Sequence, residues 1–204
     1  RPNRAGCMLA RAKNPIRIGV IVQSVETMFM HTVFEEIERA SAHFTTTGAE
    51  VLVRPLEGID AQQQLDVIDE LLEAGVQGIA LSPAEDERVR ARIQELSERM
   101  PVVTFNSDLP DSRRLCFVGQ DYAKSGRIAA ELLTKCIAPD AHVLALAGNL
   151  EYNGHRTRLD GFCSHMREKG FSSSQIDIGE TYNDYRVTYN RVAAALGSAT
   201  PPDA

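Results

Sequence analysis

IRIGVIV, residues 16–22, is the first strand that the sequence predicts, and the rest of the chain repeats its pattern. It is a short run of mostly branched apolar residues bounded by polar sequence, which is typical of a buried strand. Residues 30–48, MHTVFEEIERASAHFTTTG, follow with apolar side chains at helical spacing and end in Gly48, which favours a helix stop. A buried strand followed by an amphipathic helix is the building unit of a parallel sheet.

The same alternation continues along the chain and predicts an α/β fold class. Further strands are expected at residues 49–56, 76–83, 101–108, 115–121, 141–149 and 174–180, and further helices at 61–75, 86–100, 123–137, 155–170 and 185–198. In the helix at 61–75, Leu65, Ile68 and Leu72 are expected to form the apolar face. Such alternation specifies parallel sheets with helices on both faces and right-handed connections. We therefore expect two doubly wound units in succession, joined near residues 118–121.

Composition and charge restrict the class of protein. The chain has 204 residues, which is enough for one large domain or two small ones, and 43% hydrophobic with 25% charged residues is ordinary for a soluble globular protein. Its apolar runs are too short to span a membrane, and no secretory leader is expected at its start. The four cysteines are widely scattered, so a reduced, cytoplasmic setting without a metal knuckle is expected.

The charge of the first thirteen residues, RPNRAGCMLARAK, differs from that of the rest of the chain. This segment holds four basic residues and no acidic one, whereas the whole chain has a formal net charge of -6. The acidic balance argues against non-specific coating of nucleic acid by the body of the protein. The acidic balance of the whole chain is still compatible with a local basic segment that contacts nucleic acid.

The loops that follow the predicted strands carry the chemistry of a binding site. They contain amides, hydroxyls, carboxylates, two arginines and several large apolar groups. In open α/β sheets ligands gather outside the carboxyl ends of the strands, and this mixture suits a small polyol. No nucleophile elbow, phosphate loop or zinc motif is present, so no enzyme activity, cofactor or metal is expected. His155 is interpreted either as a ligand contact or as a solvated loop histidine.

The order of elements, the loop chemistry and the first segment together resemble the lactose-repressor/galactose-repressor (LacI/GalR) family of bacterial transcription regulators. The resemblance is carried by residues 1–22, RPNRAGCMLARAKNPIRIGVIV, and later by PVVTFNSD, VGQDYAKSGRIAAELL and RTRLDGF. It implies two Rossmann-like parallel-sheet lobes of the periplasmic-binding-protein-like type I fold. The implied domains are a hinge helix or linker at 1–14, an N-terminal lobe at 15–119 and a partial C-terminal lobe at 120–204.

The resemblance gives the first segment a role in binding DNA. Members of the family carry a DNA-reading head before the hinge and a further stretch after the last predicted helix, so this chain is expected to be part of a longer regulator. By analogy, Leu9 would wedge into a minor-groove step, while Asn3, Arg4 and Arg11 would lie near phosphates or groove edges. The alternative is a basic tail with no such role.

Within the first lobe, three residues match positions that contact the effector in relatives. Phe29 falls where relatives stack an aromatic ring on the sugar, and Met30 is adjacent to it, although Met30 could equally pack in the core. Asn106 follows a strand where relatives often place an aspartate bound to sugar hydroxyls. Ser107 stands where ribose-binding relatives have an arginine, which argues against ribose as the ligand. Asp121, at the end of the next strand and just inside the second lobe, is implied as a ligand or hinge position, and the alternative is the N-cap of the following helix.

Within the second lobe, the pattern Arg-x-x-Gly-Phe marks Arg158 as the arginine that reaches the effector in relatives. Arg156 could assist it or pair with an acid on the surface. Asn183 is assigned as a further amide contact. Together with the residues of the first lobe, these form the expected effector site.

The sequence therefore predicts a cytoplasmic, effector-responsive transcription regulator. The expected partners are operator DNA, a small carbohydrate-like effector bound between the lobes, and a second copy of the chain in a homodimer, with Val33 and Ile37 as candidates for the dimer surface. The alternative is a periplasmic sugar-binding protein of an ABC uptake system, which would share the fold and the pocket. A Rossmann-like enzyme is the third reading, and it lacks a phosphate loop and paired acid–base residues.

Overall fold

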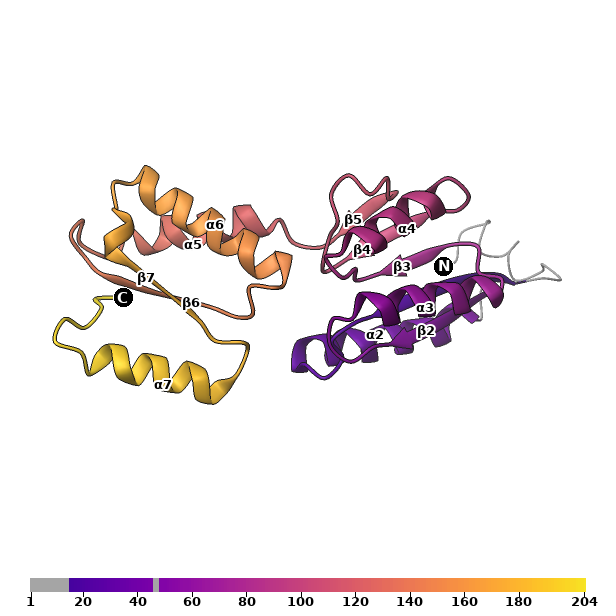
Figure 1. The fold of residues 1–204 in the computed structure, drawn as a ribbon, viewed down its shortest axis with the longest axis horizontal. Helices are drawn as coiled ribbons and strands as arrows, with labels where there is room; N and C mark the ends of the chain where they lie inside the picture. Colours follow the sequence, from indigo (N-terminus) through magenta and orange to yellow (C-terminus); the bar gives the residue numbers. More distant parts are fainter. Residues whose placement is uncertain (1–14, 46–47) are drawn as a thin grey trace. The chain divides into compact units, whose positions relative to one another are not determined.

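The computed structural model describes residues 15–45 and 48–204, and it divides into two compact units (Figure 1). Unit 1 ends at Gly119 and unit 2 runs from Gln120 to Ala204. Each unit has its own parallel sheet and its own buried core, so each is described by itself.

Over its described residues, unit 1 is a five-stranded sheet with three helices. Its elements are β1 (Ile16–Val22), α2 (Met28–Thr45), β2 (Ala49–Pro55), α3 (Ala61–Glu73), β3 (Ile79–Leu81), α4 (Glu87–Ser97), β4 (Val102–Phe105) and β5 (Cys116–Val118). The strand order is β2-β1-β3-β4-β5, and all neighbouring pairs are parallel. The predicted parallel sheet is therefore confirmed.

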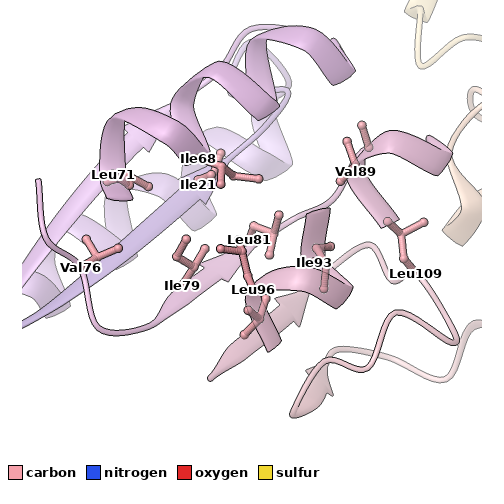
Figure 2. Close-up of a cluster of buried hydrophobic side chains, with 12 residues drawn as sticks. Ile21, Ile68, Leu71, Val76, Ile79, Leu81, Val89, Ile93, Leu96 and Leu109 are labelled. Atoms are coloured by element: carbon pink, nitrogen blue, oxygen red, sulfur yellow. The ribbon is translucent and has the colours of Figure 1, made fainter. Parts of the chain in front are cut away.

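Helices cover both faces of the unit 1 sheet, as the alternation predicts. On the face with α3 and α4, Ile21 and Leu81 of the strands form one buried cluster with Ile68 and Leu71 of α3 and Ile93 of α4 (Figure 2). On the face with α2, a smaller cluster contains Val20, Val22 and Met30, with Val33 and Ile37 packed partly against it.

The buried face of α3 differs from the predicted one. Its fully buried residues are Gln64, Ile68 and Leu71, whereas Leu65 and Leu72 are only partly buried. The predicted stripe followed the apolar residues alone. The helix is instead rotated so that Gln64 also faces the core, where its amide finds backbone partners.

Unit 2 contains a two-stranded parallel sheet and three α-helices. Its elements are α5 (Tyr122–Leu133), β6 (Val143–Ala147), α6 (Asn153–Glu168), a short 3-10 helix (Ser173–Gln175), β7 (Ile176–Glu180) and α7 (Tyr185–Leu196). The core joins Ala130 of α5, Val143 of β6 and Met166 of α6.

Two glycines bring α5 and α6 into backbone contact. A Cβ atom on Gly126 would overlap the carbonyl oxygen of Arg158, and one on Gly161 would overlap that of Ala123. Only a residue without a side chain allows this approach. The contact places the middle of α6 directly against the start of α5.

Candidate functional site

Buried polar side chains gather at the carboxyl ends of β1 and β3 in unit 1. Gln23 and Ser24 follow β1, Ser82 follows β3, and all three are almost fully buried. The Gln23 amide donates to the carbonyl of Pro83 (3.2 Å). Gln64, from α3, donates to the Ser82 carbonyl (3.0 Å) and accepts from the Ala84 amide (2.9 Å). The loop after β3 is therefore fixed by side chains of two other elements.

Two atoms of this cluster have no hydrogen-bond partner among the described residues. They are the amide oxygen of Gln23 and the hydroxyl of Ser82. Leaving a buried polar atom without a partner is costly, so these atoms are candidates to bind ligand hydroxyls. The sequence interpretation selected the apolar residues of the first loop and missed Gln23 and Ser82, although both directly follow predicted strands.

The end of β4 brings Asn106 and Met30 together. The Asn106 side-chain amide donates to the sulfur of Met30 (3.3 Å). Met30 is 5% exposed and belongs to the cluster on the α2 face of the sheet, so the core-packing alternative for this residue is realised. Phe29 is 64% exposed, and it is available for stacking on a ligand.

Strained backbone lies close to the ends of strands in both units. Ser24 follows β1, Asn106 follows β4, and Tyr182 and Asn183 follow β7, with positive φ angles of 58°, 59°, 52° and 59°. Such conformations are unfavourable for residues other than glycine and often occur at binding sites. The two asparagines had been selected from the sequence, and asparagine tolerates this region better than most residues.

Arg158 of α6 lies against the start of α5 in unit 2. Its Nη2 donates to the side-chain oxygen of Gln120 (2.9 Å), and its Cζ lies 4.8 Å from the centre of the Tyr122 ring. Asp121 accepts a hydrogen bond from the Lys124 amide (2.9 Å) and is the N-cap of α5. The capping alternative for Asp121 is thus present in the structure.

The remaining predicted residues of unit 2 lie around the loop after β6. Arg156 donates to the carbonyl of Leu150 (2.9 Å) and so supports that loop. A Cβ atom on Gly148 would overlap the side-chain oxygen of Asn183 and would lie 2.8 Å from the His155 ring. Because Gly148 has no side chain, Asn183 and His155 can both lie against its Cα. The sequence analysis did not predict this arrangement.

The ionisation of two groups near Arg158 is shifted. Burial lowers the pKa of His155, and the nearby Arg158 charge lowers it further. His155 is half-buried in the first turn of α6, so the interpretation as a solvated loop histidine is wrong. Burial raises the pKa of Tyr122, which Arg158 partly opposes. At neutral pH both rings are uncharged, and Arg158 supplies the positive charge of this cluster.

Metal sites and membrane-spanning helices were sought among the described residues. Over residues 15–45 and 48–204 no group of three or more His, Cys, Asp or Glu side chains could hold a metal ion. In the same part of the chain, no helix has the length and apolarity needed to cross a membrane. The predicted hinge residues Asn3, Arg4, Leu9 and Arg11 lie outside the described residues.

Solved structures of both a repressor and sugar-binding proteins share this fold. A lac repressor dimer bound to operator and the anti-inducer ONPF aligns with a TM-score of 0.76 at 19% identity, covering 99% of this chain and 67% of that one. A Burkholderia graminis solute-binding protein in complex with D-arabinose aligns with a TM-score of 0.75 at 20% identity, covering 91% and 63%. GanP, a glucose-galactose binding protein from Geobacillus stearothermophilus, gives 0.72 at 22% identity, covering 90% and 65%.

The coverage and the sequence identity of these matches limit the conclusion to the fold. The chain spans about two thirds of the length of these structures, and at this identity they show the fold alone. The comparison with curated proteins gives no match. A model of the periplasmic binding protein domain matches residues 18–204, which is nearly the whole chain. With its α/β, parallel-sheet units of the periplasmic-binding-protein-like type I fold, the chain belongs to the periplasmic binding protein domain family.

Proposed function

We propose that this chain is the ligand-sensing part of a LacI/GalR-type transcription regulator and that its ligand is a small sugar or polyol. The arrangement at the strand ends supports the choice of ligand. In unit 1 the unpartnered polar atoms of Gln23 and Ser82 lie at neighbouring strand ends, and in unit 2 Arg158 is held by uncharged groups. Amides, hydroxyls and a guanidinium are the groups that hydrogen-bond vicinal hydroxyls.

One observation carries the regulatory role: the segment RPNRAGCMLARAK is separated from β1 by only two residues. It resembles the hinge helix of the family, and the lac repressor dimer aligns over 99% of this chain. In this proposal a ligand that contacts both units stabilises the arrangement of units that fits it best. The change is passed to the hinge, where Leu9 wedges into DNA and Asn3 and Arg4 contact phosphates or groove edges. Such a regulator acts in the cytoplasm.

A second function, solute binding for ABC uptake, is favoured by the solved structures with bound sugars. The solute-binding proteins from Burkholderia graminis and Actinobacillus succinogenes contain D-arabinose and D-allose. The same strand-end chemistry would serve either function. The two functions differ in whether the protein binds DNA.

A thermal-shift screen tests the ligand class. Monosaccharides, polyols and sugar phosphates are added to the purified protein, and a ligand raises the melting temperature by mass action. In calorimetry, Arg158→Gln should weaken binding of the ligand by roughly tenfold or more, because a charge-assisted hydrogen bond is lost. The control is Arg186→Gln, which changes an exposed arginine of α7 and should bind as the wild type does. Equal affinity of Arg158→Gln and wild type would exclude Arg158 from the site.

Selection from a random pool of double-stranded DNA separates the two functions. The protein expressed from its own gene should enrich a palindromic sequence, with enrichment that changes when the ligand is added. Sugar binding without any enriched DNA sequence would support the uptake function instead.

Sedimentation equilibrium tests the homodimer that the regulatory role requires. A shallow apolar groove of about 350 Å³ runs along α2, and Val33, Ile37 and Ala40 are among the residues that line it, so unit 1 offers a surface for a second copy. A strictly monomeric mass at high protein concentration would contradict the dimer.

A further inference from the structure

The backbone of Arg158 is held by α5. A Cβ atom on Gly126 would overlap the Arg158 carbonyl oxygen and lie 2.8 Å from the amide nitrogen of Phe162. The two helices therefore touch at the residue whose side chain is proposed to bind ligand. The contact fixes the position of the Arg158 backbone, from which the side chain extends.

The side chain of Arg158 is also held by α5, through Tyr122 in its first turn. The guanidinium lies 4.8 Å from the ring centre, within the range of a cation–π contact. Gly154, one turn before Arg158 on α6, makes room for the ring, because its Cβ would lie 3.0 Å from two Tyr122 ring atoms. The ring thus lies along α6 against Gly154, with the guanidinium of Arg158 over it.

A third contact comes from Gln120, directly before the N-cap of α5. Its side-chain oxygen accepts a hydrogen bond from Arg158 Nη2 (2.9 Å). The contrast with Arg127, on the same pair of helices, is informative. Arg127 donates to both carboxylate oxygens of Glu168 (2.7 and 2.8 Å), so its charge is neutralised by an ion pair. The two groups that contact the Arg158 guanidinium, the Gln120 side-chain oxygen and the Tyr122 ring, are uncharged, so they orient the guanidinium without cancelling its charge.

We propose that Gln120, Tyr122 and Gly126 are positioning residues that fix the orientation of Arg158 before any ligand is present. An arginine side chain has many rotamers, and ordering it in advance removes a cost that ligand binding would otherwise bear. The inference rests on the proposed function only in one respect, namely that the ligand contacts Arg158. The orientation itself is a property of unit 2 without ligand.

Nuclear magnetic resonance on the ligand-free protein tests this orientation. In the wild type, the Arg158 Hε and Hδ protons should be shifted upfield by the Tyr122 ring, and the Nε group should be rigid. Tyr122→Leu should abolish the upfield shift and lower the order parameter of Nε toward the value below about 0.6 that marks flexible groups. Tyr122→Phe keeps the ring and should restore both signals. The Arg127 signals should be unchanged in every variant.

A second variant keeps the test decisive if Tyr122→Leu disturbs folding. Gln120 is exposed, so Gln120→Ala should leave the fold intact while increasing the mobility of the Arg158 Nη groups. Arg158 signals that match the wild type in both Tyr122→Leu and Gln120→Ala would overturn the positioning role. Wild-type ligand affinity of Arg158→Gln would instead overturn the proposed function and leave the positioning result standing.

Discussion

Single residues with unusual environments account for much of what sequence patterns miss in this protein. Gln64 is a fully buried polar residue within the core face of α3. Its amide binds the backbone on either side of Pro83, at Ser82 and Ala84, and so fixes the loop after β3. A pattern of apolar residues treats a glutamine as exposed. Here the two backbone groups that it satisfies make its burial favourable.

Gln64→Leu tests this role at the residue scale. The leucine fits the apolar surroundings but leaves the Ser82 carbonyl and the Ala84 amide buried without partners. Each such group costs about 1–3 kcal/mol, so the free energy of unfolding should fall by roughly 2–6 kcal/mol in urea titrations. Gln63→Leu changes the exposed neighbour and should shift stability by less than about 0.5 kcal/mol. Similar losses in both variants would show that Gln64 has no special role.

At the scale of elements, a network of charges joins α5 to α6 beyond the contact made by Arg158. Glu131 of α5 contacts Lys135, Lys169 and His165, and Glu168 of α6 contacts Arg127. Hydrogen bonds from Lys135 and Lys169 hold the pKa of Glu131 well below its usual range. A hydrogen bond from Arg127 lowers the pKa of Glu168 from 4.5 to about 2. Because of these pKa shifts, the stability of the α5–α6 contact depends on pH.

The sign of this linkage gives a prediction for unit 2. Because the folded-state pKa of Glu168 is depressed, its contribution to stability is complete above the unfolded value of 4.5 and is lost as pH falls toward about 2. The urea midpoint should therefore fall between about pH 5 and about pH 3, and it should fall less in Glu168→Gln. Glu73→Gln is the control, since this exposed glutamate of unit 1 has no ion pair within the described residues. An identical pH dependence for Glu168→Gln and wild type would contradict the prediction.

The whole molecule consists of two units with separate cores. The larger cluster of unit 1 runs from Ile21 to Leu109, and the cluster of unit 2 lies between Ala130 and Ile176. No residue of one cluster belongs to the other. Unit 1, with two buried clusters and a five-stranded sheet, therefore has the buried apolar surface that independent folding needs.

A fragment ending at Gly119 should accordingly fold by itself. It keeps all five strands and both core clusters of unit 1, so it should unfold cooperatively in urea with an m-value smaller than that of the whole chain. A fragment ending at Met100 lacks β4 and β5 and loses Val102 and Leu109 from the core, so it should not unfold cooperatively. Gradual, non-cooperative unfolding of the longer fragment would show that unit 1 depends on unit 2.

Features that depend on residues close together in the chain could be predicted from the sequence, whereas features that depend on distant residues could not. The parallel sheet and the helices on both of its faces were predicted from alternation alone, and Gly48, expected to stop the first helix, does adopt a positive φ angle. For the candidate site, the resemblance selected Arg158, Asn106 and Asn183, whose ligand contacts stay predictions. Gln23, Ser82, Tyr122 and Gln120 were not selected, because their importance comes from neighbours that are distant in sequence or on another element.

Periodicity and turn residues were sufficient to predict the order of strands and helices. Burial on one or two faces of an element imposes a periodic pattern of apolar residues on the sequence. The rotation of α3 toward Gln64, the contact of Gly126 with the backbone of Arg158 and the placement of its guanidinium over Tyr122 arose only in three dimensions. They depend on which backbone atoms two packed elements bring within hydrogen-bond or van der Waals distance. That distance is set by packing across the fold, and no local repeat encodes it.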